Sequence, residues 1–242
     1  MPNTIFLSSV LYSIYQEVLF RPIFNALIFL YSLTFQDLGI AIILLTIGVR
    51  VLLVPLFQRS LAAQKKMAEI QPEIKKIQDE CRDNKEEQAR RLMELYKNKG
   101  ANPFSGCLPI LVQLPVFIAL YNVFTKIFDS TQLELLYSFV VRPDVLNPVA
   151  FGILNLASPN IFMALLAGVS QYFQAATMPE PPKLQQSNSN APDMGKILSY
   201  QMKYFFPALI FFISLKLSAG MALYWTVLNI FAIVQQKLAA RS

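Results

Sequence analysis

Long apolar runs, separated by short polar stretches, dominate the pattern along this chain. A helix needs about 20 apolar residues to cross the ~30 Å hydrocarbon core of a membrane. Segments 38–57, 102–128 and 159–178 each contain a run of about that length. The stretch 204–236 is apolar except for Lys216, and as one helix it would be roughly 50 Å long, too long for the core. We divide it at the small residues of "KLSAG", and therefore predict five spanning helices: 38–57, 102–128, 159–178, 197–215 and 218–236.

Residues 1–37 carry a shorter apolar run. Segment 22–35 has too few residues for a standard span, but it suits a helix that lies in the membrane interface. Glu17 and Arg21, four residues apart, would share one face of that helix. No basic residue precedes Arg21, so the charged start of a signal peptide is missing. We favour an N-terminal interfacial helix, with an additional span as the alternative.

The polar segment 58–101 separates the first two spans. Apolar residues recur there at alternating spacings of three and four, which is typical of a helix with one narrow apolar seam. They are Met67, Ile70, Ile74, Ile77 and Cys81, followed after a polar turn by Ala89, Leu92 and Tyr96. The pattern predicts an antiparallel helical hairpin that is kinked or restarted at Pro72 and ends at Gly100 and Pro103. A solvated coiled coil, a docking element and a mobile lid are the open interpretations.

The composition supports an all-α membrane protein. Of 242 residues, 55% are apolar and 15% are charged, whereas a soluble domain carries about 25% charge. Histidine is absent, which excludes histidine-based zinc sites and acid–base catalysis. The two cysteines, Cys81 and Cys107, indicate no disulfide framework. Nothing in the sequence indicates a metal or a cofactor, and we expect none.

The basic residues predict the orientation, because Lys and Arg are enriched in cytoplasmic loops. Segments 58–106 and 179–203 and the residues after 236 carry 16 of the 21 Lys and Arg. Residues 1–37, 126–158 and 216 carry four, and Arg50 is the last. We therefore place the hairpin 58–101, the loop 179–196 and the tail 237–242 in the cytoplasm. Residues 1–37 and 129–158 are then extracytoplasmic, with the N-terminus outside and the C-terminus inside.

Arg50 lies inside the first predicted span, "LLTIGVRVLLVPL". An arginine at the centre of a span costs about 2.5–3.5 kcal/mol on insertion scales. None of the five apolar runs contains an acidic residue that could pair with it. Compensation must then come from water, backbone carbonyls or uncharged polar groups. The candidates are Thr46, Gln113, Asn122, Ser170, Gln171, Gln174, Thr226 and Asn229, although such residues also serve as hydrogen-bonding contacts between helices.

Three motifs resemble the YidC family of membrane protein insertases, relatives of the Oxa and Alb insertases. They are "IILLTIGVRVLLVPL" with the charged segment after it, "NPFSGCLPILVQLPVFIALYNVF" at 102–124, and "SAGMALYWTVLNIFAIVQQ" at 218–236. The resemblance runs in order from about residue 15 and corresponds to a short form without a large extracytoplasmic domain. It implies a five-transmembrane-helix insertase core with a cytoplasmic helical hairpin and an N-terminal interfacial helix.

The resemblance also implies a function. Insertases of this family hold a hydrophilic groove that is open to the cytoplasm and to lipid, and the arginine lies in it. On this basis the groove residues are Arg50, Thr46, Gln113, Asn122, Gln171, Gln174, Tyr224, Trp225 and Asn229. The expected protein is a non-enzymatic insertase and chaperone of the bacterial plasma membrane.

The partners implied are nascent membrane proteins and membrane lipids, with no specific nucleic acid. The Sec translocon, the signal recognition particle receptor and the ribosome are further candidates. The main alternative is a transporter or channel with Arg50 lining its pore. An intramembrane enzyme is less favoured, because the spans contain no histidine and no carboxylate pair.

Overall fold

Helices make up most of the structure, a computed structural model that describes residues 12–82, 84–102, 108–178 and 200–239. This confirms the mostly helical fold. In chain order the elements are η1 (Gln16–Phe20), α2 (Arg21–Leu33), α3 (Leu38–Glu69), α4 (Gln71–Glu80), α5 (Lys85–Lys99), α6 (Leu108–Lys126), η3 (Ser130–Leu135), β1 (Val149–Ala150), β2 (Leu154–Asn155), α7 (Ile161–Ala176), η4 (Gln201–Phe205), α9 (Phe206–Ser214) and α10 (Ala219–Ala239). The predicted loop 179–196, Pro103 and Cys107 lie outside the described residues.

The longest helix is α3, with 32 residues. Within the described residues it is the one helix both long and apolar enough to cross a membrane, while Leu111–Lys126 and α7 are shorter apolar helices. The helix does not stop at Phe57, where the apolar run ends, but continues through polar residues to Glu69. Pro55 lies within it. The first predicted span is therefore part of a longer helix. That five helices cross the membrane, and on which side each loop lies, remain predictions.

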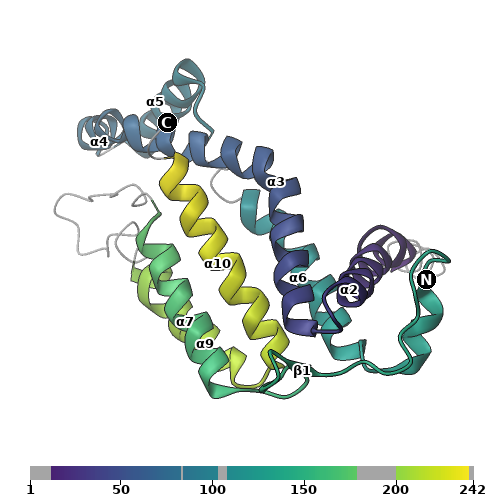
Figure 1. Ribbon diagram of the computed structural model, residues 1–242. Helices are drawn as coiled ribbons and strands as arrows, with labels where there is room; N and C mark the ends of the chain where they lie inside the picture. Colours follow the sequence, from purple (N-terminus) through teal and green to yellow (C-terminus); the bar gives the residue numbers. More distant parts are fainter. Residues whose placement is uncertain (1–11, 83, 103–107, 179–199, 240–242) are drawn as a thin grey trace, which may run out of the picture.

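The centre of the bundle is α10, which packs between α3 and α7, while α9 packs on α7 (Figure 1). Small residues permit these close contacts. A Cβ atom placed on Gly168 of α7 would lie 3.0 Å from the Cβ of Phe211 and 3.2 Å from the carbonyl oxygen of Pro207, both on α9. Ala167 and Ala222 are likewise fully or almost fully buried. Van der Waals contact between small residues is how helices associate where lipid replaces water.

The N-terminal helix is continuous from residue 12 to Leu33, with a π-helical turn at η1. Its buried face, including Phe20, Phe24 and Leu27, packs on α3 and α6. Asn25 fixes the helix to the end of η3 and to the residues after it. Its amide donates to the Leu135 carbonyl at 3.1 Å, and its oxygen accepts from the Tyr137 N–H at 2.6 Å. The helix is therefore an integral part of the bundle.

The hairpin formed by β1 and β2 joins the N-termini of α3 and α10. Asp37 caps α3 by accepting from the N–H groups of Gly39 and Ile40, and its second oxygen accepts from the Phe151 N–H at 2.6 Å. Past the hairpin, the carbonyls of Leu156 and Ser158 accept from the first N–H groups of α10 at 3.1 and 2.9 Å. These backbone donors have no partner within their own helices, so Asp37 satisfies the first donors of α3, and the segment after the hairpin satisfies those of α10.

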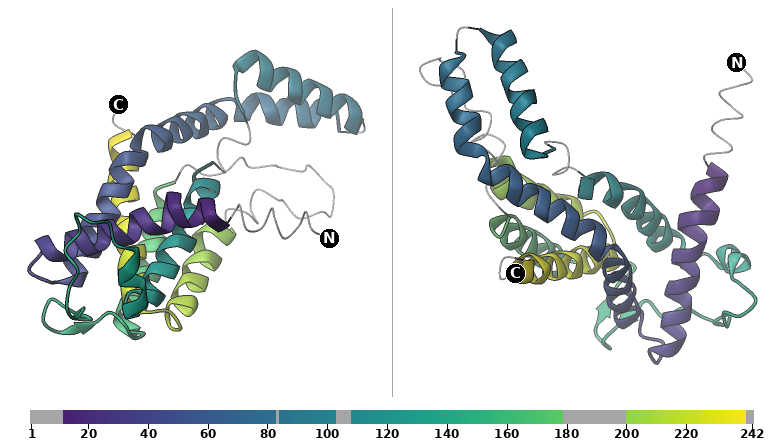
Figure 2. Two further views of the ribbon diagram at one scale, coloured as in Figure 1. Left: turned by 90° about the vertical axis from the view of Figure 1, so that its right-hand side faces the viewer. Right: turned by 90° about the horizontal axis from the view of Figure 1, so that it is seen from above.

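The α4–α5 pair projects from the opposite end of α3 (Figure 2). Pro72 lies in the first turn of α4, directly after the break at Ile70, and Gly100 ends α5 with a left-handed φ of 56°. Ile70, Ile74 and Leu95 form a small apolar core between the two helices. Contacts of Glu73 with Lys99 at 2.6 Å and of Glu80 with Arg91 at 3.0 Å show that the helices run antiparallel.

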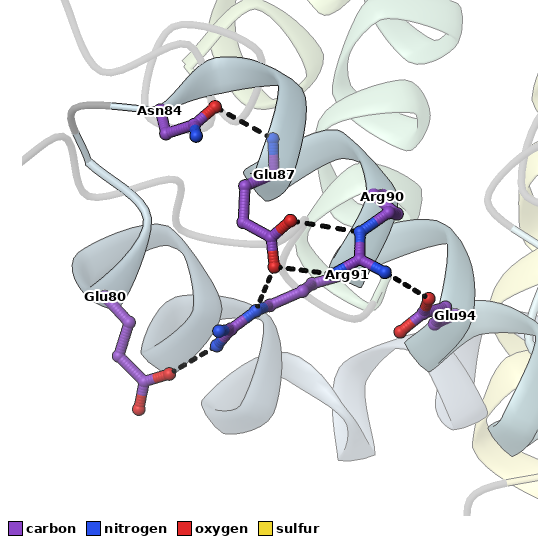
Figure 3. A network of polar contacts seen from close by, with 6 residues as sticks. All are labelled: Glu80, Asn84, Glu87, Arg90, Arg91 and Glu94. Atoms are coloured by element: carbon purple, nitrogen blue, oxygen red, sulfur yellow. Dashed lines mark hydrogen bonds and ion pairs between the residues drawn. The ribbon is translucent and has the colours of Figure 1, made fainter.

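The charges of the α4–α5 pair neutralise one another. Glu87 accepts hydrogen bonds from Arg90 and Arg91 at 2.8–3.0 Å, while Arg91 also reaches Glu80 and Arg90 reaches Glu94 (Figure 3). Hydrogen bonds from Arg90 and then Arg91 lower the pKa of Glu87 from 4.5 to about 2. All these side chains are substantially exposed, so each pair contributes little to stability.

Candidate functional site

Arg50 is a buried charge on α3, and its residue is 6% exposed. Its guanidinium lies over the ring of Phe57, with Cζ 4.5 Å from the ring centroid. The Nε–H is buried and has no hydrogen-bond partner. Among the residues that the structure describes, none forms an ion pair or a hydrogen bond with Arg50. A cation–π contact with Phe57 is therefore its main direct interaction.

Two other helices meet α3 near this arginine. Tyr224 of α10 lies close to Arg50 and is 2% exposed. Gln113 of α6 donates a hydrogen bond from Nε2 to the Tyr224 hydroxyl. Since that hydroxyl already accepts from Gln113, its own proton is available to a further acceptor. Arg50, Gln113 and Tyr224, which we call the arginine site, thus bring donor groups from three helices together.

Thr46 lies one turn before Arg50 and is buried. Its hydroxyl donates to the Ile42 carbonyl of its own helix at 2.6 Å. Thr226 on α10 makes the same kind of bond to the Ala222 carbonyl at 2.9 Å. These bonds satisfy hydroxyl donors inside an apolar helix, and each oxygen retains acceptor capacity toward a neighbour.

A second polar cluster joins α7 to α10. The Trp225 indole N–H donates to Gln171 Oε1 at 3.2 Å, and the Gln171 amide donates to Gln174 Oε1 at 3.2 Å. Asn229 donates to the Ser170 hydroxyl at 3.1 Å. Trp225 also stacks edge-to-face with Phe117 of α6, with ring centroids 5.2 Å apart. This cluster connects the predicted groove residues of α7 with those of α10, and Trp225 links it to α6.

Asn122 does not join either cluster. It lies nine residues beyond Gln113, about 14 Å along α6, and donates to the Tyr15 hydroxyl of the N-terminal helix at 2.7 Å. Its position fits the alternative of an interhelical contact. Thr177 extends the α7–α10 contact through a hydrogen bond with Gln236.

Phe57 and Thr177 were not among the predicted site residues. Phe57 follows Arg50 by seven residues, which is two helical turns, so helical spacing could have identified it. No such rule could pair Thr177 with Gln236, because the contact depends on which helices are neighbours.

The arginine site offers hydrogen-bond donors from a guanidinium, a phenol and an amide, with the Phe57 ring beside them. No cluster of three or more His, Cys, Asp or Glu that could hold a metal occurs in the described part of the chain. Guanidinium and phenol donors together suit a carboxylate or a backbone carbonyl.

Comparison with known proteins gives a consistent set of relatives. The sequence model of the family described as "60Kd inner membrane protein" matches residues 29–242. The chain is 30% identical over 227 residues to the "Membrane protein insertase YidC" of Rickettsia rickettsii (strain Sheila Smith), which is 90% of this chain and 38% of the relative. The proteins of the same name from Shewanella pealeana and Methylobacterium nodulans are 33% and 31% identical over 217 and 228 residues, covering 90% and 89% of this chain. The chain spans 34–38% of the length of these three relatives.

Proposed function

Because this chain belongs to the 60Kd inner membrane protein family, we propose that it is a membrane protein insertase and chaperone of the bacterial plasma membrane. Its substrates are newly made membrane proteins, which it receives in a hydrophilic groove that contains Arg50. The groove is lined by Arg50, Thr46, Gln113, Gln171, Gln174, Tyr224, Trp225 and Asn229. Asn122 is left out, since it contacts Tyr15 instead.

The observation that carries the proposal is the isolation of Arg50. A buried guanidinium that forms no ion pair with the described residues is costly, and a structural role would favour a pairing partner. The Phe57 ring offers only about 0.5–2 kcal/mol of cation–π attraction and uses none of the five N–H donors. These donors remain available to an acidic side chain of an incoming substrate, which can accept two parallel hydrogen bonds.

The depth of Arg50 in the membrane suits a substrate segment that enters the membrane only part of the way. Thirteen residues separate Asp37 from Arg50, about 20 Å along α3. In a core of about 30 Å, the arginine then lies about 10 Å from the other boundary. With the predicted orientation, that boundary is cytoplasmic. A substrate segment would need to enter only the cytoplasmic third of the membrane to meet the charge.

The energy for insertion would come from the substrate itself. Transfer of its apolar helix into lipid is favourable, and the membrane potential acts on its charges. The groove would lower the barrier for the polar segment that must cross. Candidate partners that deliver or share substrates are the Sec translocon, the signal recognition particle receptor and the ribosome. Membrane lipids surround the bundle.

Purified protein in liposomes tests this proposal. Insertion of a single-span substrate with acidic residues in its translocated segment is measured beside the flux of ions and small solutes. The matched substrate carries Asn and Gln in place of these acidic residues. We expect insertion above that of protein-free vesicles, a preference for the acidic substrate, and no solute flux. Flux without insertion would instead identify a transporter or channel with Arg50 in its pore.

A further inference from the structure

The end of the bundle where α3, α7 and α10 begin has an exposed apolar surface. Phe35, in the turn between α2 and α3, is 99% exposed, and Ile153, at the tip of the β1–β2 hairpin, is 90% exposed. Phe162 in the first turn of α7 is 71% exposed. Figure 1 places the α2–α3 turn, the hairpin and the start of α7 at this one end, opposite the α4–α5 pair. We call Phe35, Ile153 and Phe162 the apolar rim.

The backbone at two of these turns is strained. Phe35 and Phe151 both have a φ of +53°, a left-handed conformation that bulky side chains rarely adopt. The hairpin turn has positive φ at Phe151 and Gly152, where Asn or Asp followed by Gly is usual. Left-handed backbone costs about 1–2 kcal/mol at a residue with a side chain. In a loop exposed to water, Gly or Asn at such a position would avoid this cost. In this chain both positions are phenylalanine.

Charge is absent from the sequence of the hairpin and of α7, and the same end also carries Asp37, which bonds to the hairpin, and Lys216, in the turn before α10. Residues 145–179 contain no Asp, Glu, Lys or Arg, and this stretch includes the whole hairpin and all of α7. A loop that extends into water normally carries polar and charged residues. The rim also continues into the exposed apolar faces of the helices below it, which include Ile40 and Leu44 of α3 and Leu165 of α7. The apolar surface therefore does not end where the helices end.

We propose that the apolar rim inserts into the interfacial layer of the lipid bilayer and anchors this end of the bundle there. Aromatic and aliphatic side chains partition favourably into the boundary between headgroups and acyl chains. The occupant of this surface is thus lipid, not another protein. The inference requires only that the bundle crosses a membrane, and it holds whether or not the protein inserts substrates.

The anchor would also set the depth of Arg50. Asp37 joins the α3 end to Phe151 of the hairpin, and Leu156 joins the hairpin to Gly220 of α10. With the rim held at the interface, these bonds fix both helix ends at one level. Arg50 then lies at a constant distance from that boundary, about 20 Å along α3. The rim thereby defines how deep the arginine site lies.

Single tryptophans test this proposal in the complete protein. The chain contains one tryptophan, so Trp225→Phe gives a parent protein without tryptophan fluorescence. Phe35→Trp and Ile153→Trp are each introduced into it, and Met93→Trp serves as the control. Met93 is a 70% exposed apolar residue of α5, in the charged pair that we expect in water. All variants are reconstituted into liposomes, with iodide on both sides of the bilayer or with lipids brominated near the headgroups, and circular dichroism checks their fold.

We expect blue-shifted emission from both rim tryptophans, with quenching by brominated lipid several-fold stronger than for Met93→Trp and weaker quenching by iodide. Quenching by iodide equal to that of the control would overturn the proposal. Protection from both quenchers would also overturn it, because protein would then cover the rim. The two rim positions lie in independent loops, so a fold defect in one variant leaves the other as a complete test.

Discussion

The two ends of α3 use opposite chemistry. At its first residues the helix is tightly packed and almost uncharged: Asp37 caps it, and a Cβ atom on Gly39 would lie 2.6 Å from the Cβ of Ala150. At its last residues it leads into the α4–α5 pair, which is small-cored, exposed and rich in charge. One end is held by close packing, whereas the other carries exposed ion pairs around a small apolar core.

Arginine shows the contrast most clearly. Arg91 in α5 reaches two carboxylates at 2.8 and 3.0 Å and remains exposed. Arg50 of α3 is buried, and among the described residues it lies near the Phe57 ring and the Tyr224 phenol. An arginine that is already paired has few donors left to offer a ligand, whereas an unpaired buried one retains them all. The described residues thus leave the N–H donors of Arg50 unused, whereas Arg91 is engaged with Glu80 and Glu87.

The largest expected effect comes from removing the unpaired charge. Arg50→Ala should lower insertion of the acidic substrate by about tenfold or more, because a hydrogen bond to a charged group contributes about 1.5–3 kcal/mol. Arg50→Lys should retain much of the activity, since it keeps the charge. Melting temperature in detergent should hold or rise for Arg50→Ala, as a buried cation is gone. Insertion yield and melting temperature are measured for each variant.

The control is Arg59→Ala, which removes the same charge from an exposed position on the same helix. It should change insertion little for either substrate. If both Arg50 variants lose many degrees of melting temperature, then Arg50 is a structural clamp that hydrogen-bonds several helices, and the contrast between the two kinds of arginine fails.

The next effect concerns the tightly packed end. Gly39→Ala should destabilise the bundle by about 1–3 kcal/mol, because its Cβ would collide with Ala150 and with the Phe151 ring at 2.8 Å. Gly48→Ala is the matched control on the same helix, where a Cβ meets nothing within 4 Å. It should be neutral or stabilising by up to about 1 kcal/mol, since alanine favours helix. Thermal unfolding followed by circular dichroism distinguishes them, and equal melting temperatures would refute the close packing of this end.

How far the sequence predicts this molecule depends on whether a feature is local. The hydropathy runs predicted apolar helices near their observed positions. The proline rule predicted a kink or a restart at Pro72, where the structure has a restart, and the glycine rule predicted the end at Gly100. The extension of α3 past Phe57 was missed, because we ended the segment where apolarity stopped. Helix propensity persists through the polar residues up to Glu69.

Contacts between segments were harder to predict. Asn122 and Gln113 lie on one helix and look alike in sequence, yet one contacts Tyr15 and the other Tyr224. Their partners depend on which helices are neighbours, and hydropathy carries no information about that. The Asp37 contact with Phe151, across 114 residues, was invisible for the same reason. The sequence alone identified Arg50 as a charge inside an apolar run. The residues that lie around it could be identified only from the folded structure.

The smallest expected effect concerns the charged end, through Glu87. Its pKa is lowered from 4.5 to about 2 by hydrogen bonds from Arg90 and Arg91. A carboxyl group with a lowered pKa stabilises the folded state above its unfolded pKa, and this contribution is lost as the pH falls from about 4.5 toward 2. The α4–α5 pair should therefore melt at progressively lower temperature across that range, by a few degrees at most, because the groups are exposed.

Fluorescence of Met93→Trp in the Trp225→Phe background reports this local melting. Glu87→Gln should melt lower than the parent at pH 7 and should lose the Glu87 part of the pH dependence, so that the two proteins converge near pH 2. A constant difference between them at every pH would mean that the ion pairs of Figure 3 contribute nothing to the α4–α5 pair.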